Sequence, residues 1–379
     1  MLRKLFTSIP NLSRDRSVFG GHSNGAHTTA VLLEREDPVL LEHFPRFFLH
    51  EGGQRLLLAD ALDREPLRSA PLLVMMGGTT APVAAKGVPG GPPPKVAAGT
   101  RFPSMARINE RLEELRAQRA GNFTLVRMAG YGHEQPPEYL KLIGQWVRGE
   151  PLDDVPAQLR RLTAALRLPL TRHPDSSAWP DLCNADLSTH RLPGGNVWSY
   201  RDGILTATED KNIWTRREYR DCVLDFEFKF EPGANSGVFL YNSDPEKWMP
   251  TSVEIQICDD AAPQWKAKPA TWHCGAFFGH QAPKKSAVKP AGAWNRMTLT
   301  VQGPRLTVVL NDEVVNEIDL TRWTSGTQNP DGSAIPDWLH GKPWSELPTK
   351  GRIGFQGRHA GAGIEFRKIK LLRIDLPSP

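Results

Sequence analysis

The sequence predicts a multidomain protein in which an α/β segment with a parallel sheet precedes an all-β antiparallel sandwich. Its 379 residues exceed the usual size of a domain with one hydrophobic core. Before residue 150, short apolar strands are followed by helical patterns. In residues 222–231, by contrast, apolar side chains recur at every second position, which is the period of a strand. The 33 glycines and 33 prolines supply the turns of an all-β domain. We assign residues 1–149 to the α/β domain, 150–178 to a linker with a short helix over 155–168, and 179–376 to the sandwich.

The composition argues against nucleic-acid and membrane partners. The net charge is +5, and no run of Lys and Arg is dense enough for a nucleic-acid surface. No apolar run approaches the ~20 residues of a membrane span, and residues 1–10 lack the apolar core of a signal peptide. The four cysteines show no Cys-x-x-Cys spacing, so we expect buried free thiols rather than disulfides or metal ligands.

The first domain contains the pattern of a nucleophilic serine. A short strand at residues 17–20 runs into Gly-His-Ser-Asn-Gly at 21–25, and a helical pattern follows to residue 34. Strand, G-x-S-x-G and helix are the context of a nucleophile elbow, in which Ser23 would stand exposed on a sharp turn. Further strands are expected at 71–76 and 123–128, and His133 follows the last of them. Residues 10–150 thus resemble the C-terminal half of the α/β-hydrolase family, which implies Ser23 as nucleophile and His133 as base.

Two departures from that family weaken the expectation of activity. The loop at residues 77–82, where the family carries its acid, has no carboxylate, and Glu51, Asp60 and Asp63 fall outside that position. The early strands are absent, together with the loop that donates half of the oxyanion hole, and losing one such donor costs about 10²–10³ in rate. We expect a truncated structural remnant whose open sheet edge is either covered by a partner or completed by an upstream gene start. An active serine esterase is the alternative.

The second domain shows strands with one polar face each. Apolar side chains recur at every second position over 253–257, 297–301 and 306–310, and shorter strands are expected near 353–355 and 364–369. Glu254 and Gln256 share the face opposite Val253, Ile255 and Ile257. A polar cleft on a concave sheet and a solvated outer face both explain this pair. Ten of the eleven tryptophans follow residue 170, and aromatic rings stack on sugars, which favours the cleft.

Many short motifs of the second domain agree, in order, with one known family. They lie at residues 182–188, 198–205, 214–215, 219–221, 235–237, 254–257, 294–295, 311, 354–356 and 366–369. Over residues 180–374 the chain resembles the 3-keto-disaccharide (3-keto-glycoside) hydrolase family, which implies a jelly-roll sandwich of the concanavalin/laminin-G type. Cys183, Ala185 and Lys368 depart from the family pattern, and residues 261–273 are peculiar to this chain. These differences affect the identity of the substrate more than the fold.

The resemblance implies cleavage of a glycosidic bond in a sugar already oxidised at C3. The ketone acidifies the proton on C2, so a base can remove it, the enolate can expel the C1 substituent, and water can add back. Such a site needs a base, a donor to the enolate oxygen and an acid for the leaving group, rather than two carboxylates flanking C1.

Site residues follow from this chemistry and the motifs. Glu254 and His359 are the candidate base and acid. Asn235, Gln256 and Gln356 would orient the hydroxyls and the ketone, Arg358 would stabilise the enolate, and Trp294 would pack against a sugar ring or, more ordinarily, in the core. Asp259 and Asp260 could hold a divalent cation with Glu254, but loop solvation is the simpler interpretation, so no cofactor and no metal site are assigned.

Three functions stay open at this point, and the partner expected for the sandwich is a small carbohydrate. The first is a keto-glycoside hydrolase or lyase, the second a carbohydrate-binding sandwich without catalysis, and the third a serine esterase that uses Ser23 and His133. The sugar, the aglycone and the oligomeric state are not specified by the sequence. Cellular location also stays open, because the family resemblance favours export whereas a start at Met1 favours the cytoplasm.

Overall fold

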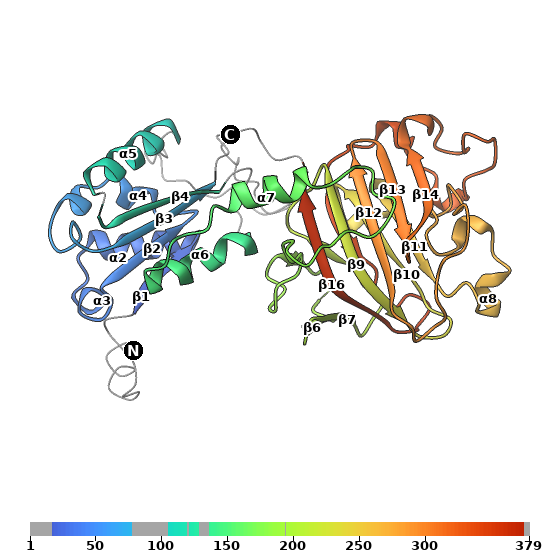
Figure 1. The fold of residues 1–379 in the computed structure, drawn as a ribbon, viewed down its shortest axis with the longest axis horizontal. Coiled ribbons are helices and arrows are strands. Elements are labelled where there is room, and N and C mark those ends of the chain that lie inside the picture. The colour runs from blue at the N-terminus through green and yellow to red at the C-terminus, as the bar shows by residue number, and fades with distance from the viewer. Residues whose placement is uncertain (1–16, 78–104, 120, 129–135, 194, 375–379) are drawn as a thin grey trace, which may run out of the picture. The chain divides into compact units, whose positions relative to one another are not determined.

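The chain forms two compact units (Figure 1). A computed structural model describes residues 17–77, 105–119, 121–128, 136–193 and 195–374. One unit comprises residues 1–156 with 377–379, and the other comprises residues 157–376. The division falls inside helix α7 (Val155–Ala164), within the segment that the sequence predicts as a linker.

The N-terminal unit contains a four-stranded, wholly parallel sheet in the order β1-β2-β3-β4. Its strands are β1 (Val18–His22), β2 (Arg46–His50), β3 (Leu72–Gly77) and β4 (Phe123–Met128). The strands at β1, β3 and β4 match the prediction, whereas β2 is an additional central strand. Within the described residues β1 pairs only with β2, so its other edge carries no strand.

Few helices accompany this sheet. They are α2 (Asn24–Glu34), α3 (Pro38–His43), α4 (Gln54–Leu57), α5 (Met105–Gln118) and α6 (Pro137–Arg148). Buried side chains of α2 and α5, such as Leu33 and Leu112, share one core with Val74 of β3. Because side chains alternate along a strand, Leu73 and Met75 are buried on the opposite face.

Helix α7 is shorter than predicted, since it ends at Ala164 and not at Leu168. Leu168 precedes Pro169, and the proline ring disfavours the helical conformation for the residue before it. Leu159 and Leu162 lie in the helix, whereas Leu166, which continues their apolar spacing, lies beyond its end.

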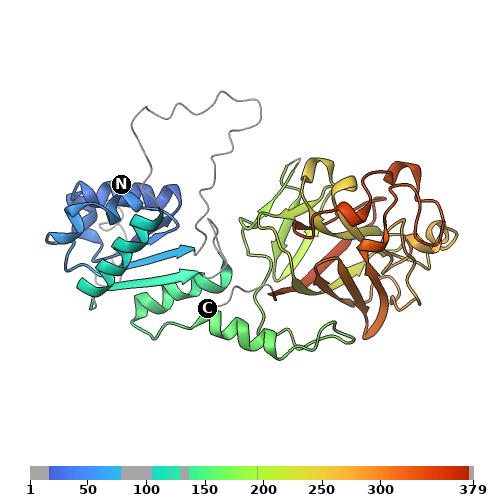
Figure 2. The same ribbon diagram turned by 90° about the horizontal axis from the view of Figure 1, so that it is seen from above.

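The C-terminal unit is a sandwich of two antiparallel sheets, as predicted. The five-stranded sheet has the order β11-β10-β15-β8-β5 and the seven-stranded sheet the order β14-β13-β12-β9-β16-β7-β6. The elements are β5 (His190–Arg191), β6 (Trp198–Arg201), β7 (Ile204–Ala207), β8 (Ile213–Thr215), β9 (Cys222–Phe230), β10 (Asn235–Asn242), β11 (Val253–Cys258), α8 (Pro263–Lys266), β12 (Asn295–Gln302), β13 (Arg305–Leu310), β14 (Glu313–Asp319), β15 (Arg352–Phe355) and β16 (Ile364–Arg373). Figure 2 gives a second view of the strands.

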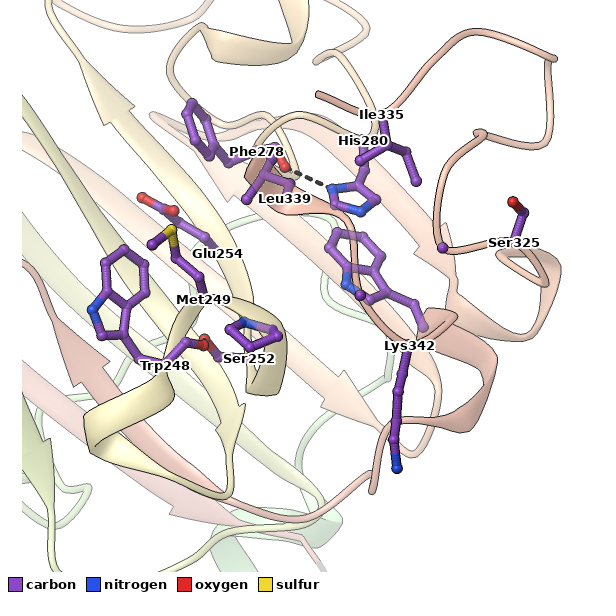
Figure 3. A pocket seen from close by; sticks show the side chains of 14 residues that line it. Trp248, Met249, Ser252, Glu254, Phe278, His280, Ser325, Ile335, Leu339 and Lys342 are labelled. Carbon is purple, nitrogen blue, oxygen red and sulfur yellow. Dashed lines mark hydrogen bonds between the residues drawn. The ribbon is translucent and has the colours of Figure 1, made fainter. Parts of the chain in front are cut away.

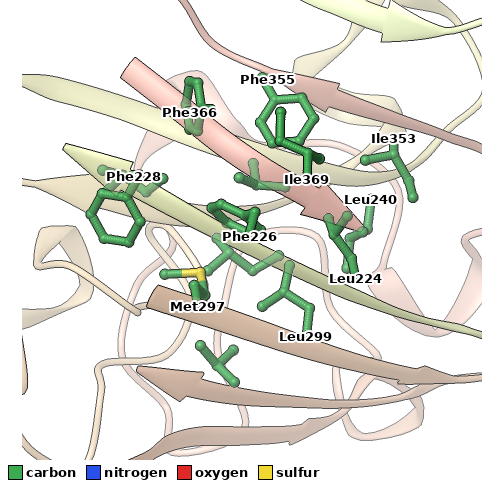
Figure 4. Close-up of a cluster of buried hydrophobic side chains, with 14 of the residues drawn as sticks. Leu224, Phe226, Phe228, Leu240, Met297, Leu299, Ile353, Phe355, Phe366 and Ile369 are labelled. Atoms are coloured by element: carbon green, nitrogen blue, oxygen red, sulfur yellow. The ribbon is translucent and has the colours of Figure 1, made fainter. Parts of the chain in front are cut away.

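The core of the sandwich lies between the two sheets (Figure 4). Phe226 of β9 and Phe366 of β16 meet Phe355 of the other sheet, with ring centroids 5.8 Å and 4.9 Å from that ring. These contacts use the apolar face that the alternation of β9 predicts. With one face of the five-stranded sheet filled in this way, its polar side chains lie on the opposite face.

Phe226 offers a test of this core, since its side chain is fully buried against three other aromatic rings. We expect Phe226→Ala to lower the free energy of unfolding of the sandwich by about 3–5 kcal/mol, because the cavity cannot close completely. Tryptophan fluorescence during denaturation reports mainly on this unit, which contains most of the tryptophans. A loss below about 1 kcal/mol would contradict the packing described.

All four cysteines are buried free thiols, as the sequence predicts. Burial raises the pKa of Cys183, Cys258 and Cys274 above that of an ordinary thiol, which disfavours the reactive thiolate. In the described part of the chain, no helix is both long and apolar enough to cross a bilayer.

Candidate active site

The predicted polar residues form the floor of a cavity on the outer face of the five-stranded sheet. Strand β10 presents Asn235 there and β11 presents Glu254, while Gln256, on the same face of β11, lies buried against Asn235 and outside the lining. Gln356 follows β15, whose strand pairs with β10. The cavity has a volume of about 570 Å³ and includes Asn235, Glu254 and Gln356 in its lining.

Gly237 makes room for the Glu254 carboxylate. It lies opposite Gln256 in the register of β10 and β11, next to the pair Phe239 and Glu254. A Cβ atom at position 237 would lie 2.3 Å from Oε1 of Glu254, which is closer than any real contact. The Asn-Ser-Gly motif therefore has a steric reason, because the Glu254 side chain extends across the strand at its glycine.

We expect Gly237→Ala to displace the Glu254 carboxylate and to lower activity by about 10²-fold, the cost of a misplacement of about 1 Å in an active site. Steady-state kinetics would measure this loss. Gly121→Ala is the matched control, since a Cβ at Gly121 meets nothing within 4 Å. Equal activity of the two variants would contradict the steric role of Gly237.

Glu254 is a carboxyl group enclosed by apolar side chains. Figure 3 shows Trp248, Met249 and Phe278 around its carboxylate. Within the described residues no hydrogen bond to this carboxylate is formed, and burial raises its pKa to about 8. At neutral pH the group therefore retains its proton and can act as an acid.

Glu254 also lines a second, smaller cavity of about 20 Å³ (Figure 3). This volume holds about one water molecule. His280 borders it, stacked on Trp344 with ring centroids 3.6 Å apart, and its Nδ1 lies 2.8 Å from the carbonyl oxygen of Phe278. Burial lowers the pKa of His280 to about 4, so the ring is neutral at pH 7 and does not compete with Glu254 as a proton donor.

Buried amides adjoin Glu254 on the floor of the larger cavity. Nε2 of Gln256 donates to Oδ1 of Asn235 over 3.0 Å, which leaves the Nδ2 amide of Asn235 to face the cavity as a donor. The backbone N–H of Gln356 donates to the carbonyl of Gly237, and its own carbonyl accepts from the hydroxyl of Ser236. The residues Asn235, Ser236, Gln256 and Gln356 are each at most 6% exposed, so packing and these hydrogen bonds hold their side chains in place.

His359 stands at the edge of the floor and is paired with Asp210. Nδ1 of His359 and Oδ2 of Asp210 are 2.8 Å apart, and both side chains line the larger cavity. The loop that carries Asp210 is held to the His359 loop by backbone bonds, from Gly357 to Lys211 and from Arg358 to Glu209. A carboxylate on Nδ1 fixes the tautomer in which Nε2 carries the lone pair. Asp210 was not predicted from the sequence.

Trp294 and Arg358 are not brought into the cavity. The Trp294 ring lies beneath the guanidinium of Arg367, 3.8 Å from ring centroid to Cζ, and Lys229 approaches it to 4.9 Å. The Arg358 side chain donates to the carbonyl of Gly361 and pairs with Glu231 at 3.6 Å. Trp294 therefore lies neither in the cavity nor in the core, the two positions that the sequence analysis considered, and Arg358 organises its own loop.

Asp259 and Asp260 do not form a cluster with Glu254. Each accepts a hydrogen bond from a backbone amide instead. Oδ2 of Asp259 accepts from the N–H of Gly233, and Oδ1 of Asp260 accepts from the N–H of Cys274. Among the described residues no group of three or more potential metal ligands is assembled. The two aspartates therefore stabilise loops at the end of β11.

In the N-terminal unit, Ser23 has the local geometry of a nucleophile elbow. It joins β1 to α2 with φ 54° and ψ −117°, a strained conformation for a residue with a side chain. The end of β1 and the start of α2 approach closely, since a Cβ at Gly21 would lie 2.5 Å from the carbonyl carbon of Gly25. His133, the predicted base, lies outside the described residues.

Glu51 occupies a position that the sequence argument set aside. It follows β2, the strand next to β1, and so lies at the same carboxyl edge of the parallel sheet as Ser23. The residue is 8% exposed with φ 51°, and its Oε1 accepts from the N–H of Gly77 at the end of β3. Glu51 remains outside the loop in which the family carries its acid, but it lies at the sheet edge of Ser23 because it follows β2, a strand that the sequence did not predict.

The sandwich with its polar floor and aromatic walls belongs to the carbohydrate-active β-sandwich proteins. A family described as the 3-keto-alpha-glucoside-1,2-lyase-like domain matches residues 178–372, slightly more than half of the chain. The chain belongs to this family. A search of curated proteins gives no match.

Two solved structures are similar to the sandwich. A candidate glycosyl hydrolase from Parabacteroides distasonis ATCC 8503 is 45% identical, covers 52% of this chain and 99% of its own, and superposes with a TM-score of 0.50. A second candidate glycosyl hydrolase from that organism is 21% identical, covers 50% of this chain and 90% of its own, and has a TM-score of 0.40. The resemblance of the N-terminal unit to α/β-hydrolases is not shown by these comparisons and stays a prediction.

Proposed function

We propose that the sandwich cleaves glycosides oxidised at C3, by removal of the C2 proton, elimination at C1 and addition of water. The observation that carries this proposal is that the Glu254 carboxyl, whose pKa is raised by burial, shares one cavity with the His359–Asp210 pair. An acid and a base of this kind are what elimination beside a ketone requires. Family membership and the 45% identical glycosyl-hydrolase candidate support the substrate class.

His359 is the base in this mechanism. Its Nδ1 is held by Asp210, so Nε2 is the atom that can accept the C2 proton. The electron pair of the C2–H bond moves toward C3, and the ketone oxygen becomes an enolate. The charge that develops on His359 is balanced by the Asp210 carboxylate.

Glu254 is the acid for the leaving group. As the enolate collapses, a C1–C2 double bond forms, the C1–O bond breaks, and the departing oxygen takes the Glu254 proton. The product is an alcohol and an unsaturated keto sugar. If water then adds at C1, the product is the free keto sugar and the overall reaction is hydrolysis. If the unsaturated keto sugar is released before water adds, the enzyme is a lyase.

The buried amides serve the ketone and the hydroxyls of the sugar. The Nδ2 amide of Asn235 is a donor suited to the developing enolate oxygen, because Gln256 already occupies its Oδ1 atom. A donor fixed in place by a buried network needs no reorganisation as the charge develops. Gln356 would bind a neighbouring hydroxyl from the opposite side of β10.

The proposal is tested by offering a chromogenic 3-keto-glucoside and its unoxidised parent to the full-length protein. We expect release of the chromophore from the keto form only. The double variant Glu254→Gln, His359→Gln is the control for spontaneous elimination and contaminating activity. Binding of the keto sugar without release above that control would instead favour a carbohydrate-binding sandwich without catalysis.

The dependence of kcat/KM on pH shows whether Glu254 acts as an acid or as a base. Its pKa of about 8 lies above the ordinary value, so the protonated form dominates below pH 8 and is lost above it. We expect kcat/KM for an alkyl 3-keto-glucoside to fall about tenfold per pH unit above pH 8. A rate that instead rises up to pH 8 and then levels off would assign Glu254 as the base.

A second candidate function, serine acyl transfer in the N-terminal unit, is favoured by the strained backbone of Ser23 and by Glu51 at the same sheet edge. Labelling by a serine-directed phosphonate tests it. We propose that wild type reacts and Ser23→Ala does not, with Ser17→Ala as the matched control. An unlabelled wild-type protein would leave the N-terminal unit as a structural remnant.

A further inference from the structure

The wall of the larger cavity exposes apolar surface that the core does not need. Among the described residues, Met249 and Trp338 are the two large apolar side chains with high exposure, 44% and 50%. Both line this cavity, although they come from separate loops. Contiguous exposed apolar groups beside a polar floor are typical of a surface that binds a ligand.

Three rings build one side of this wall. Trp272, Phe278 and Trp338 contact one another, with centroid distances of 5.2 Å, 5.8 Å and 5.6 Å for the three pairs. Trp272 and Trp338 meet edge to face at 86°. This packing holds the rings in place and leaves half of the Trp338 surface facing outward.

Trp248 and Met249 also line the cavity. The Trp248 ring packs on Phe239 of β10 with centroids 4.7 Å apart, so the wall is continuous with the floor of the cavity. The five side chains Trp248, Met249, Trp272, Phe278 and Trp338 are together called the apolar rim.

Hydrogen-bonding groups are distributed unevenly around the cavity. The floor offers Asn235, Glu254 and Gln356, His359 with Asp210 stands at its edge, and Lys211, Asn212 and Glu246 also line the cavity. The apolar rim offers no carboxylate, amide or hydroxyl side chain, and its indole N–H groups can only donate. The hydroxyls of a second sugar ring would find no acceptor among these five side chains, and burying a hydroxyl against them without a partner is costly.

We propose that the apolar rim binds the aglycone, and that the preferred aglycone is a flat aromatic group and not a second sugar. This inference rests on the proposed function, since it places the keto sugar on the polar floor. The scissile bond would then lie where floor and rim meet, next to Glu254, whose carboxylate the rim residues Trp248 and Phe278 border. An aromatic aglycone is stabilised by stacking on the rings of the rim and by edge-to-face contacts with them.

The test compares three 3-keto-glucosides whose leaving groups are all ordinary alcohols: methyl, benzyl and glucosyl. This choice removes the advantage that a phenol has as a leaving group. We expect kcat/KM to be highest for the benzyl compound, by about tenfold or more over methyl, from burial of one ring. A glucosyl compound that exceeds the benzyl compound would overturn the proposal.

Variants of the rim then assign the preference to these residues. Trp338→Ala and Met249→Ala should each lower the benzyl-to-methyl ratio toward one. Trp338→Ala should leave the rate on the methyl compound unchanged, because Trp338 is not among the residues around the Glu254 carboxylate. Trp294→Ala is the matched control, because that tryptophan lies outside the cavity. A ratio unaffected by both rim variants would overturn the assignment.

Calorimetric titration with unoxidised benzyl glucoside and methyl glucoside separates this inference from the proposed function. If no keto-glycoside is cleaved, the proposed function fails, and tighter binding of the benzyl compound, lost in Trp338→Ala, would still support the rim. If keto-glycosides are cleaved but benzyl and methyl glucosides bind and react equally, the rim fails alone.

Discussion

Replacing Glu254 by Gln is expected to lower the cleavage of methyl 3-keto-glucoside by about 10³-fold, within the range that a positioned acid contributes. Gln fills the space beside Gly237 as the native side chain does, but it has no acidic proton to give to the departing alcohol. Affinity for the sugar should change little, because the floor amides Asn235 and Gln356 are untouched. Initial rates and calorimetric titration with an unreactive sugar would measure the two effects separately.

The leaving group shows what Glu254 does in the reaction. If it protonates the departing oxygen, Glu254→Gln should lose much less activity on a nitrophenyl 3-keto-glucoside, since that anion leaves without help. If Glu254 instead stabilises the enolate, both substrates should lose activity equally. Glu246→Gln, a carboxyl variant in the lining of the same cavity, is the control and should keep near-native rates on both.

The floor of the site could be predicted because it follows from the period of a strand. Glu254 and Gln256 are two residues apart, so they had to share one face once Val253 and Ile255 were assigned to the core. The motif at residues 235–237 then lies on the neighbouring strand. What the pattern does not contain is the clearance at Gly237, which appears only when the two strands are paired.

Asp210 could not be predicted by the same reasoning. It stands in a polar turn, Glu-Asp-Lys-Asn at 209–212, whose composition is that of any solvated loop. Its importance comes from a contact with His359, 149 positions away along the chain. The same holds for Met249 and Trp338, which lie in separate loops and meet only at the cavity.

Two errors of the sequence interpretation have local causes. Strand β2 was not predicted because its apolar run, Phe47 to Leu49, is only three residues long between Arg46 and the polar pair His50 and Glu51. Such a run can be assigned as a strand only when the parallel strands on either side are known. Trp294 matches a motif of the family, yet its ring is used to carry the Arg367 and Lys229 cations. A motif position identifies a residue as important without telling whether it binds or packs.

The second large effect is expected at the His359–Asp210 pair. His359→Gln should abolish exchange of the C2 proton with deuterium from solvent, because no base remains, and should lower turnover by about 10²–10⁴-fold. Glu254→Gln should retain this exchange, since removal of the proton precedes the step that needs the acid. Mass spectrometry of the recovered keto-glycoside measures the exchange directly, apart from bond cleavage.

Asp210→Asn tests whether the carboxylate positions the base. An amide that donates to Nδ1 would favour the tautomer with a proton on Nε2, which cannot accept the C2 proton. Because both side chains are about half exposed, at 47% and 50%, water can restore the active tautomer for part of the time. We therefore expect a loss of about 10–10²-fold, smaller than for His359→Gln. Glu209→Gln, in the same loop but outside the cavity lining, is the control, and equal exchange rates for Asp210→Asn and this control would show that His359 works without its partner.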